Sequence, residues 1–329
     1  MCDARRGRLR LYRMTLITMI NESNCSFEDV DALMRPLELV IYVPIFLLGI
    51  VLNVSALWVF CFVFKKWTES TIYMINLAIM DVLLLLQLPF KMHATNNKWL
   101  ANKKHLCSFL ESLYFMAMYG SIYIIMCISV DRYLGICHPF YAKSLRSKKS
   151  ARIVCLVIWV LVIVVTTPVY TFHEDIQETF HCFHGFSNKG WNLWLIVCLE
   201  VFGFLLPAFV LICCSVKSIR TLRNPKFTFT PGRQAGVRII HSSLCAFLVP
   251  FTPCHIAIFF QYLVRSSTIT ECDAQQRISL FLQLSMSLAN ITCFLDAIFY
   301  YFVAKEVRAG KDTIRMSLTR IKSMSTSDA

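Results

Sequence analysis

The chain has 329 residues, of which 57% are hydrophobic and only 16% are charged. Soluble domains contain about 25% charged residues, so this composition indicates a membrane protein that crosses the bilayer several times. In a soluble protein the formal net charge of +13 would suggest nucleic-acid binding. Here we assign it to basic loops on the cytoplasmic side of a membrane, and nucleic acid is excluded as a partner.

Residues 1–36 form a polar tail, which we expect to be extracellular. Asn21 and Asn24 each begin an Asn-x-Ser sequon, which indicates glycosylation outside the cell. Five arginines before them oppose this orientation under the positive-inside rule. A start of translation at Met14 or Met19 would remove them. The later loops fix the orientation more firmly, so the tail is kept outside.

Seven apolar stretches are long enough to cross a membrane, which takes about 20 residues of α-helix. We expect them at about 37–64, 71–95, 107–132, 151–170, 191–222, 235–264 and 277–303. Basic residues follow the first, third, fifth and seventh stretches, so these ends are predicted to be cytoplasmic. The sequence therefore predicts an all-α plasma-membrane protein, with a seven-helix bundle at 37–303. A cytoplasmic tail at 304–329 is expected to begin with a short amphipathic eighth helix.

The third stretch carries a cysteine at one end and a charged triplet at the other. Cys107 and Arg132 are 25 positions apart (132 − 107), about 37 Å along a helix, so they lie at opposite membrane surfaces. Arg132 is permanently charged and offers five hydrogen-bond donors. We expect it to pair with Asp131 at rest and, once released, to bind an inserted partner helix. The alternative is an arginine that only anchors the helix end at the interface.

Two carboxylates, Asp81 and Asp296, lie inside predicted spans, where an ionised acid is costly. Two buried acids repel each other unless a cation or a proton lies between them. With Asn53 and Ser121 they form a candidate Na⁺ site. The alternative is a protonated, hydrogen-bonded polar core without an ion. No other metal and no cofactor are expected.

Four cysteines lie where an oxidising exterior would reach them, and four cysteines allow three pairings. Geometry favours Cys107 with Cys182, which ties the third helix to the loop between the fourth and fifth helices. It also favours Cys25 with Cys272, which ties the amino-terminal tail to the loop between the sixth and seventh. Both bridges would cover an outward-facing cavity.

The outer halves of the second, third, fifth and sixth spans combine basic and aromatic residues, which predicts a cavity for an anionic amphiphile. Lys91 and Arg265 would supply positive charge, and we expect Glu111 and Glu200 to pair with Lys91 or to bind a polar headgroup. The alternatives are ordinary packing for the aromatic residues and, for Lys91, an ammonium that reaches back to the interface. The candidate ligand-binding residues are Lys91, Glu111, Tyr114, Phe115, Met118, Glu200, Phe251, His255, Phe259 and Arg265.

Together these landmarks resemble those of rhodopsin-like G-protein-coupled receptors. The resemblance implies heterotrimeric G proteins, arrestin and receptor kinases as partners. The sequence departs from the family pattern in the seventh helix, where Asp296-Ala297 stands in place of the usual Asn-Pro. This change removes the basis for a proline kink. The family's landmark residues are Asn53, Asp81, Arg132, Trp159, Pro207, Pro253 and Tyr300, and those implied in coupling are Asp131, Arg132, Tyr133 and Tyr300.

Within that family, residues 72–78, 88–92, 199–207 and 281–286 are similar to receptors that respond to lysophosphatidylinositol, also described as atypical cannabinoid-responsive receptors. This likeness implies an anionic lysophospholipid ligand with Lys91 and Glu111 at binding positions. It also implies signalling through the G-twelve/thirteen and Gq classes to Rho and calcium.

A receptor for a nucleotide or a small carboxylate is the alternative within the family. The chain has no inverted repeat, which disfavours a transporter or channel. The intact Asp131-Arg132-Tyr133 triplet argues, weakly, against a non-signalling scaffold. An enzyme is disfavoured because no nucleophile–base set and no metal-ligand spacing occur.

Overall fold

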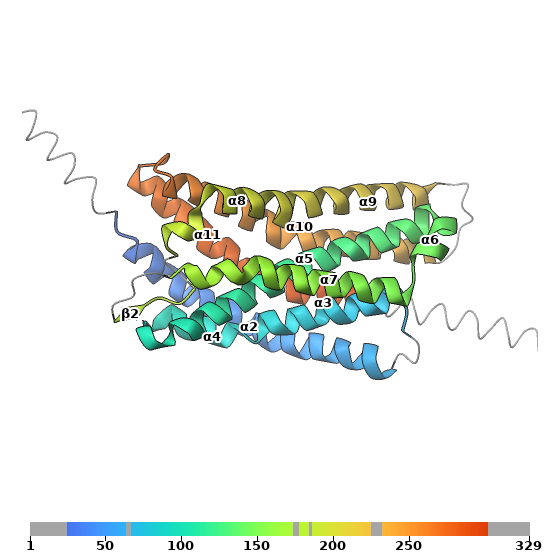
Figure 1. Cartoon of the computed structure of the whole chain (residues 1–329), viewed down its shortest axis with the longest axis horizontal. Helices are drawn as coiled ribbons and strands as arrows, with labels where there is room; N and C mark the ends of the chain where they lie inside the picture. Colours follow the sequence, from blue (N-terminus) through green and yellow to red (C-terminus); the bar gives the residue numbers. More distant parts are fainter. Residues whose placement is uncertain (1–24, 64–66, 174–177, 184–185, 225–231, 302–329) are drawn as a thin grey trace, which may run out of the picture.

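The computed structural model describes residues 25–63, 67–173, 178–183, 186–224 and 232–301, and in it the chain forms a long bundle of helices (Figure 1). Seven helical segments in this part of the chain are long and apolar enough to span a membrane, which confirms the predicted all-α, seven-helix bundle. The sequons at Asn21 and Asn24 and the proposed eighth helix, with the tail at 304–329, lie outside the described residues. The spans are Glu28–Val63, Glu69–Asn96, Ala101–Cys137, Lys148–Thr171, Leu193–Arg223, Gly236–Arg265 and Cys272–Tyr301.

The first span, α2 (Glu28–Trp58), begins well before the apolar stretch that the sequence marks from residue 37. Glu28, Asp29 and Asp31 lie in its first turn, where negative charge is favoured by the helix dipole. The helix therefore extends into the polar tail. After Trp58 it continues as the π-helix η1 (Val59–Val63).

Prolines interrupt the second and fourth spans near their C-terminal ends. The second consists of α3 (Glu69–Leu85) and α4 (Leu88–Asn96), and Pro89 lies in the first turn of α4. A proline is tolerated there because the first amides of a helix have no intrahelical acceptor. The fourth, α7 (Lys148–Thr166), tightens into the 3₁₀-helix η3 (Thr167–Thr171) at Pro168 in the same way.

The fifth span is interrupted by a π-helix just before Pro207. It runs through α8 (Leu193–Glu200), η5 (Val201–Leu205) and α9 (Leu206–Arg223). The Tyr123 hydroxyl donates to the Phe202 carbonyl in η5 at 2.9 Å. A side chain from another helix thus satisfies a backbone group within the π-helix.

The sixth span, α10 (Gly232–Arg265), contains Pro250 and Pro253 and is one continuous helix. The seventh is not: α11 (Cys272–Ala289) ends in a turn at Asn290–Ile291, and helix resumes to Tyr301. The Asn290 amide nitrogen, Nδ2, donates to the carbonyls of Met286 and Ser287, at 3.0 Å each. The α-helix is therefore interrupted here without a proline, and the asparagine side chain supplies a donor to carbonyls at the interruption.

At the centre of the bundle lies α5 (Lys104–Cys137), which follows the 3₁₀-helix η2 (Ala101–Lys103) and packs against α3, α7 and α9. Gly120 allows the close approach to α3, since a Cβ there would lie 2.6 Å from the Met80 methyl. A short helix, α6 (Pro139–Leu145), follows α5 at the end near Arg132. We call this the arginine end of the bundle.

The opposite end is closed by loops and by both predicted disulfides, Cys107–Cys182 and Cys25–Cys272, which the structure confirms. The strands β1 (Trp99–Leu100) and β2 (Thr179–Phe180) pair antiparallel there, with Trp99 opposite Phe180. A 3₁₀-helix, η4 (Asn188–Trp191), leads into α8. We call this the disulfide end.

Candidate ligand cavity and coupling site

A cavity of about 800 Å³ opens among the helices at the disulfide end, within the size range of small-molecule sites. One part of it is polar and lies among α2, α4 and α11, where Glu38, Lys91, Thr95 and Gln283 line the wall. The other part is apolar and runs between α5, α7 and the α8–η5 segment. Its walls there include Phe115, Leu161, Val162, Val165, Val169, Cys198 and Phe202.

The apolar part of the cavity reaches the outer surface of the bundle. Val165 on α7 is 63% exposed and Phe202 on η5 is 55% exposed, and both line the cavity. Side chains on the outside of a membrane-spanning helix face lipid tails. The cavity therefore joins a polar interior to the hydrocarbon region between the fourth and fifth spans.

Lys91 is buried at the polar end, with its ammonium over aromatic rings. The nitrogen lies 4.2 Å from the centroid of Tyr114, 5.5 Å from Tyr42 and 5.8 Å from Phe183. In the described part of the chain no carboxylate oxygen lies within 4 Å of it. Ring faces attract a cation but do not neutralise it. Its charge is therefore available to an anion in the cavity.

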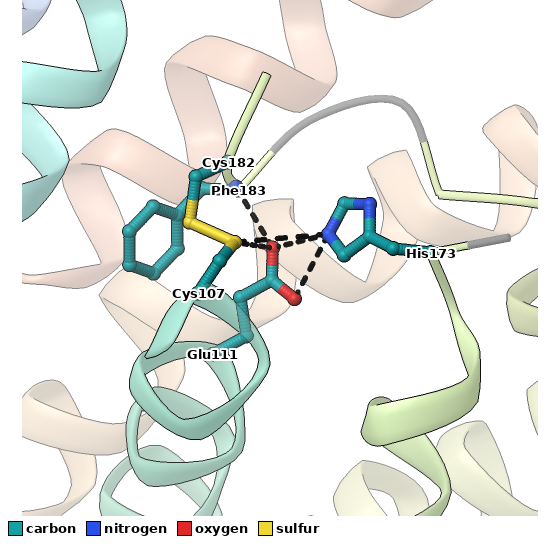
Figure 2. Close-up of polar contacts among 5 residues, drawn as sticks. All are labelled: Cys107, Glu111, His173, Cys182 and Phe183. Atoms are coloured by element: carbon teal, nitrogen blue, oxygen red, sulfur yellow. Dashed lines mark hydrogen bonds and ion pairs between the residues drawn. A yellow bond between two sulfur atoms is a disulfide. The ribbon is translucent and has the colours of Figure 1, made fainter. Parts of the chain in front are cut away.

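Glu111 does not pair with Lys91, which was one of the two roles expected for it. It is fully buried on α5 and is held from two sides, as Figure 2 shows. Its Oε1 accepts hydrogen bonds from the backbone N–H of Phe183 and from His173 Nε2, each at 2.8 Å, and Oε2 lies 3.1 Å from the same nitrogen. Because a carboxylate only accepts, Nε2 of His173 carries the proton.

The disulfide end is therefore tied together at Glu111. His173 and Phe183 lie on the loop between the fourth and fifth spans, on either side of Cys182 and its bridge to Cys107. The carboxylate and the disulfide thus hold the same loop against α5. Cys107, Glu111 and Cys182 form a close cluster, but it is not a metal site, because both sulfurs are oxidised in the disulfide and cannot act as thiolate ligands.

Glu200 also has a partner other than Lys91. His255 Nδ1 lies 3.2 Å from Glu200 Oε2, which joins α8 to α10. The His255 ring stacks on Phe204, with centroids 4.5 Å apart, and Phe204 stacks on Phe247 at 5.8 Å. Glu200 and His255 thus belong to a packed polar and aromatic core.

Three of the ten candidate ligand residues, Lys91, Phe115 and Arg265, line the cavity. Arg265 lies at its rim, 5.8 Å over the ring of Trp191. Phe259 is 49% exposed on the outside of α10. The other six are buried or partly buried and do not line the cavity: Glu111, Tyr114, Met118, Glu200, Phe251 and His255. Ligand contact by these ten residues stays a prediction.

At the arginine end, Asp131 is bound by Arg146, which the sequence marks only as one of several basic residues after the third span. Arg146 reaches it with a fork of two hydrogen bonds, Nε to Oδ1 at 2.7 Å and Nη2 to Oδ2 at 2.8 Å. Ser70 donates to Oδ2 at 3.0 Å. The expected pairing of Asp131 with Arg132 is thus replaced by one with Arg146. This hydrogen bonding raises the pKa of the Arg146 guanidinium above its ordinary value.

Asp81, Asn53, Ser121 and Asp296 are all buried in the bundle interior, and their joint role as an ion site stays a prediction. Tyr300 donates to Asp81 Oδ2 at 2.9 Å, and the Asn53 amide donates to the Cys293 carbonyl at 3.0 Å. Thr292 lies 3.4 Å from Asp296 Oδ2. Three oxygens here are buried without a hydrogen-bond partner in the described part of the chain: Asp81 Oδ1, Asn53 Oδ1 and the Ser121 hydroxyl.

Two site residues were missed from the sequence, Glu38 and Arg146. Glu38 is an acid inside an apolar run, and the rule that picked out Asp81 would have found it. No sequence signal distinguishes Arg146 from the other bases near it, because its role depends on where the chain turns after α6.

A chain of seven membrane helices, with an Asp-Arg-Tyr triplet at one end and a disulfide-covered cavity at the other, has the architecture of a receptor. Residues 52–300 match the family described as "7 transmembrane receptor (rhodopsin family)". The chain belongs to this family. It is a G-protein-coupled receptor and a multi-pass protein of the plasma membrane, and not an enzyme.

Relatives are similar over most of the chain. Mouse (Mus musculus) G-protein coupled receptor 55 is 43% identical over 300 residues, which cover 87% of this chain and 91% of that receptor. The human receptor of the same name is 42% identical over 291 residues, 87% and 90% of the two chains. Lysophosphatidic acid receptor 6 of chicken (Gallus gallus) is 32% identical over 292 residues, 86% and 94% of the two chains.

Proposed function

We propose that this receptor is activated by an anionic lysophospholipid of the lysophosphatidylinositol type. The observation that carries the proposal is the two-part cavity. A buried ammonium without a carboxylate partner within 4 Å in the described chain, Lys91, lies in its polar part, and its apolar part reaches the lipid-facing surface. A phosphate headgroup fits the first and an acyl chain the second. Several relatives are named as lysophosphatidic acid receptors, which supports a lipid of this class.

The disulfide end, with the first described residues of the chain, would face the outside of the cell, where disulfides persist. The arginine end would then face the cytoplasm and receive heterotrimeric G proteins. The proposed output runs through the G-twelve/thirteen and Gq classes to Rho and calcium. Arrestin and receptor kinases would end the signal at the same end of the bundle.

A nucleotide or a small carboxylate is the second candidate ligand. Lys91 and Arg265 would bind its charge equally well. The apolar part of the cavity argues against it, since such a ligand leaves that part unfilled. An acyl chain buries it at about 0.8 kcal/mol per methylene group.

The test is Rho activation in cells that express the receptor, with lysophosphatidylinositol titrated in. Lys91→Ala should shift the dose curve to higher concentration, and Arg132→Ala should abolish output at equal surface expression. Lys98→Ala is the matched control, because this exposed lysine at the disulfide end does not line the cavity. A wild-type receptor that reaches the surface but stays silent would refute the ligand, and nucleotides and small carboxylates would be tested next.

We further propose that the polar interior around Asp81 binds Na⁺ as an allosteric ion. Carboxylate, amide and hydroxyl oxygens suit a hard cation, and the partnerless oxygens of Asp81, Asn53 and Ser121 support this. Asp296 supplies a second buried charge. Purified receptor should melt at a higher temperature in sodium chloride than in choline chloride of equal ionic strength, and Asp81→Asn should remove the difference. Equal melting of the wild type in both salts would favour a protonated core.

A further inference from the structure

Glu38 is a buried acid that the receptor architecture described so far does not use. It lies on α2, is 4% exposed and lines the polar part of the cavity. Its Oε2 accepts a hydrogen bond of 2.6 Å from the Thr95 hydroxyl. Its other oxygen, Oε1, has no hydrogen-bond partner among the described residues. Unlike the fully buried oxygens without a partner elsewhere in the bundle, Oε1 is accessible from the cavity.

The partner of Glu38 is held in place by its own helix. The Thr95 hydroxyl is also 3.0 Å from the Lys91 carbonyl one turn earlier on α4. The two acceptors share the single hydroxyl hydrogen, so the Thr95 side chain is held between its own helix and the Glu38 carboxylate. Glu38 is therefore a preorganised acceptor with one oxygen left for something in the cavity.

The position of Glu38 relative to Lys91 follows from helix geometry. Tyr42 lies four residues after Glu38 on α2, and Thr95 lies four residues after Lys91 on α4. Residues four apart lie on one face of a helix, about one turn or 5.4 Å along it. The Lys91 ammonium lies over Tyr42, while Thr95 contacts Glu38. The Lys91 ammonium and the Glu38 carboxylate therefore lie along the same wall of the cavity, more than 4 Å apart.

We propose that Glu38 accepts a hydrogen bond from a hydroxyl group of the ligand's headgroup while Lys91 binds its phosphate. This rests on the proposed lysophospholipid ligand. An ionised carboxylate only accepts hydrogen bonds, so the ligand must supply the donor. A neutral hydroxyl suits the site better than an ammonium, because Lys91 and Arg35 in the same cavity repel a second cation.

The pair of contacts makes the polar part of the cavity a subsite for a polyol phosphate. A headgroup with several hydroxyls beyond its phosphate reaches both Lys91 and Glu38. Lysophosphatidic acid has no hydroxyl beyond its phosphate. Its one free hydroxyl belongs to the glycerol, on the acyl side of the phosphate, so with the phosphate at Lys91 and the acyl chain in the apolar part, Glu38 would face an anion rather than a donor. Glu38 is then the residue that favours lysophosphatidylinositol over lysophosphatidic acid.

The experiment measures receptor activation by lysophosphatidylinositol and by lysophosphatidic acid with the same acyl chain. Both lipids are titrated on wild type and on Glu38→Gln, which keeps the size and an acceptor for Thr95 but presents a donor to the ligand. We expect lysophosphatidylinositol to lose at least about tenfold in potency, equivalent to about 1.4 kcal/mol. Lysophosphatidic acid should keep its potency or gain. Lysophosphatidylethanolamine, which carries an ammonium, should be weaker than lysophosphatidylinositol on wild type.

Two further variants keep the result decisive. Glu28→Gln removes the same charge from an exposed position on α2 outside the cavity and should change neither potency. Thr95→Val removes the hydroxyl that fixes Glu38 and should lower the lysophosphatidylinositol potency selectively, even if Glu38→Gln does not reach the surface. An equal shift for both phospholipids overturns the role of Glu38 while the receptor's lipid ligand stands. A wild type that responds to none of the lipids overturns the ligand class itself.

Discussion

Replacement of Glu111 by glutamine tests whether this residue anchors the loop or binds the ligand. In Glu111→Gln an amide oxygen at the Oε1 position can still accept from the Phe183 N–H and from His173 Nε2, but it carries no charge. The amide nitrogen takes the Oε2 position, 3.1 Å from the same His173 nitrogen, so two buried donors face each other. Such a change costs about 1–3 kcal/mol.

The assay is the melting temperature of the purified receptor without any ligand. With an unfolding entropy of about 2.1 cal/mol/K per residue, each kcal/mol shifts the melting temperature of a 329-residue chain by about 1.5 °C, so we expect a drop of about 1.5–4.5 °C. The centroid of the His173 ring lies 5.2 Å from that of Phe180 and 5.6 Å from that of Phe186. His173→Phe keeps a ring packed there and removes the hydrogen bond to Glu111. The double variant should therefore lose less than the sum of the two single ones.

The reasoning is refuted if Glu111→Gln melts like the wild type without ligand and loses potency for one ligand only. That pattern would make Glu111 a ligand contact. An anchor predicts the opposite: lower stability in the empty receptor and weaker binding of chemically different ligands, because the loop that covers the cavity is no longer held.

Two other predictions concern the coupling end and the cavity wall. Arg146→Ala should lower G-protein nucleotide exchange at matched surface expression, because it releases Asp131 to bind the neighbouring Arg132. Gly203→Ala should lower the melting temperature by an amount equivalent to about 1–3 kcal/mol, since its new Cβ would lie 2.8 Å from the Tyr119 ring, which lines the cavity.

Each of these variants has a matched control. Lys148→Ala removes an exposed base close to Arg146 and should leave nucleotide exchange unchanged, and equal or higher exchange in Arg146→Ala would contradict its assigned role. Gly120→Ala adds a Cβ at 2.6 Å from the flexible end of Met80, which can move, so it should cost less than Gly203→Ala. The reverse order would show that the Tyr119 ring is free to yield.

The sequence predicts the bundle because the information is spread over many residues. Each span sums the hydropathy of about 20 side chains, and an error at one position does not matter. The disulfides follow for a similar reason, since few cysteines lie outside the apolar runs. The residues at the helix ends, such as Arg132, are placed once the spans are known.

Individual pairings are not predictable in this way. Glu111 was grouped with Lys91 because both lie in outer halves of neighbouring spans, yet its partners come from a loop more than 60 residues later. A rotation of α5 by one residue would turn the carboxylate elsewhere. Which base reaches Asp131 likewise depends on a turn after α6, and neither hydropathy nor spacing records that turn.

The interruption at Asn290 differs in kind from a proline kink. A proline deletes a backbone N–H, so the carbonyl it exposes can never recover its own amide and the bend is permanent. Here every amide is still present. The Asn290 side chain donates to the Met286 carbonyl, and it shares the Ser287 carbonyl with its own backbone N–H. The interruption of the seventh helix is thus held by one amide side chain, and no backbone atom that regular helix needs is missing there.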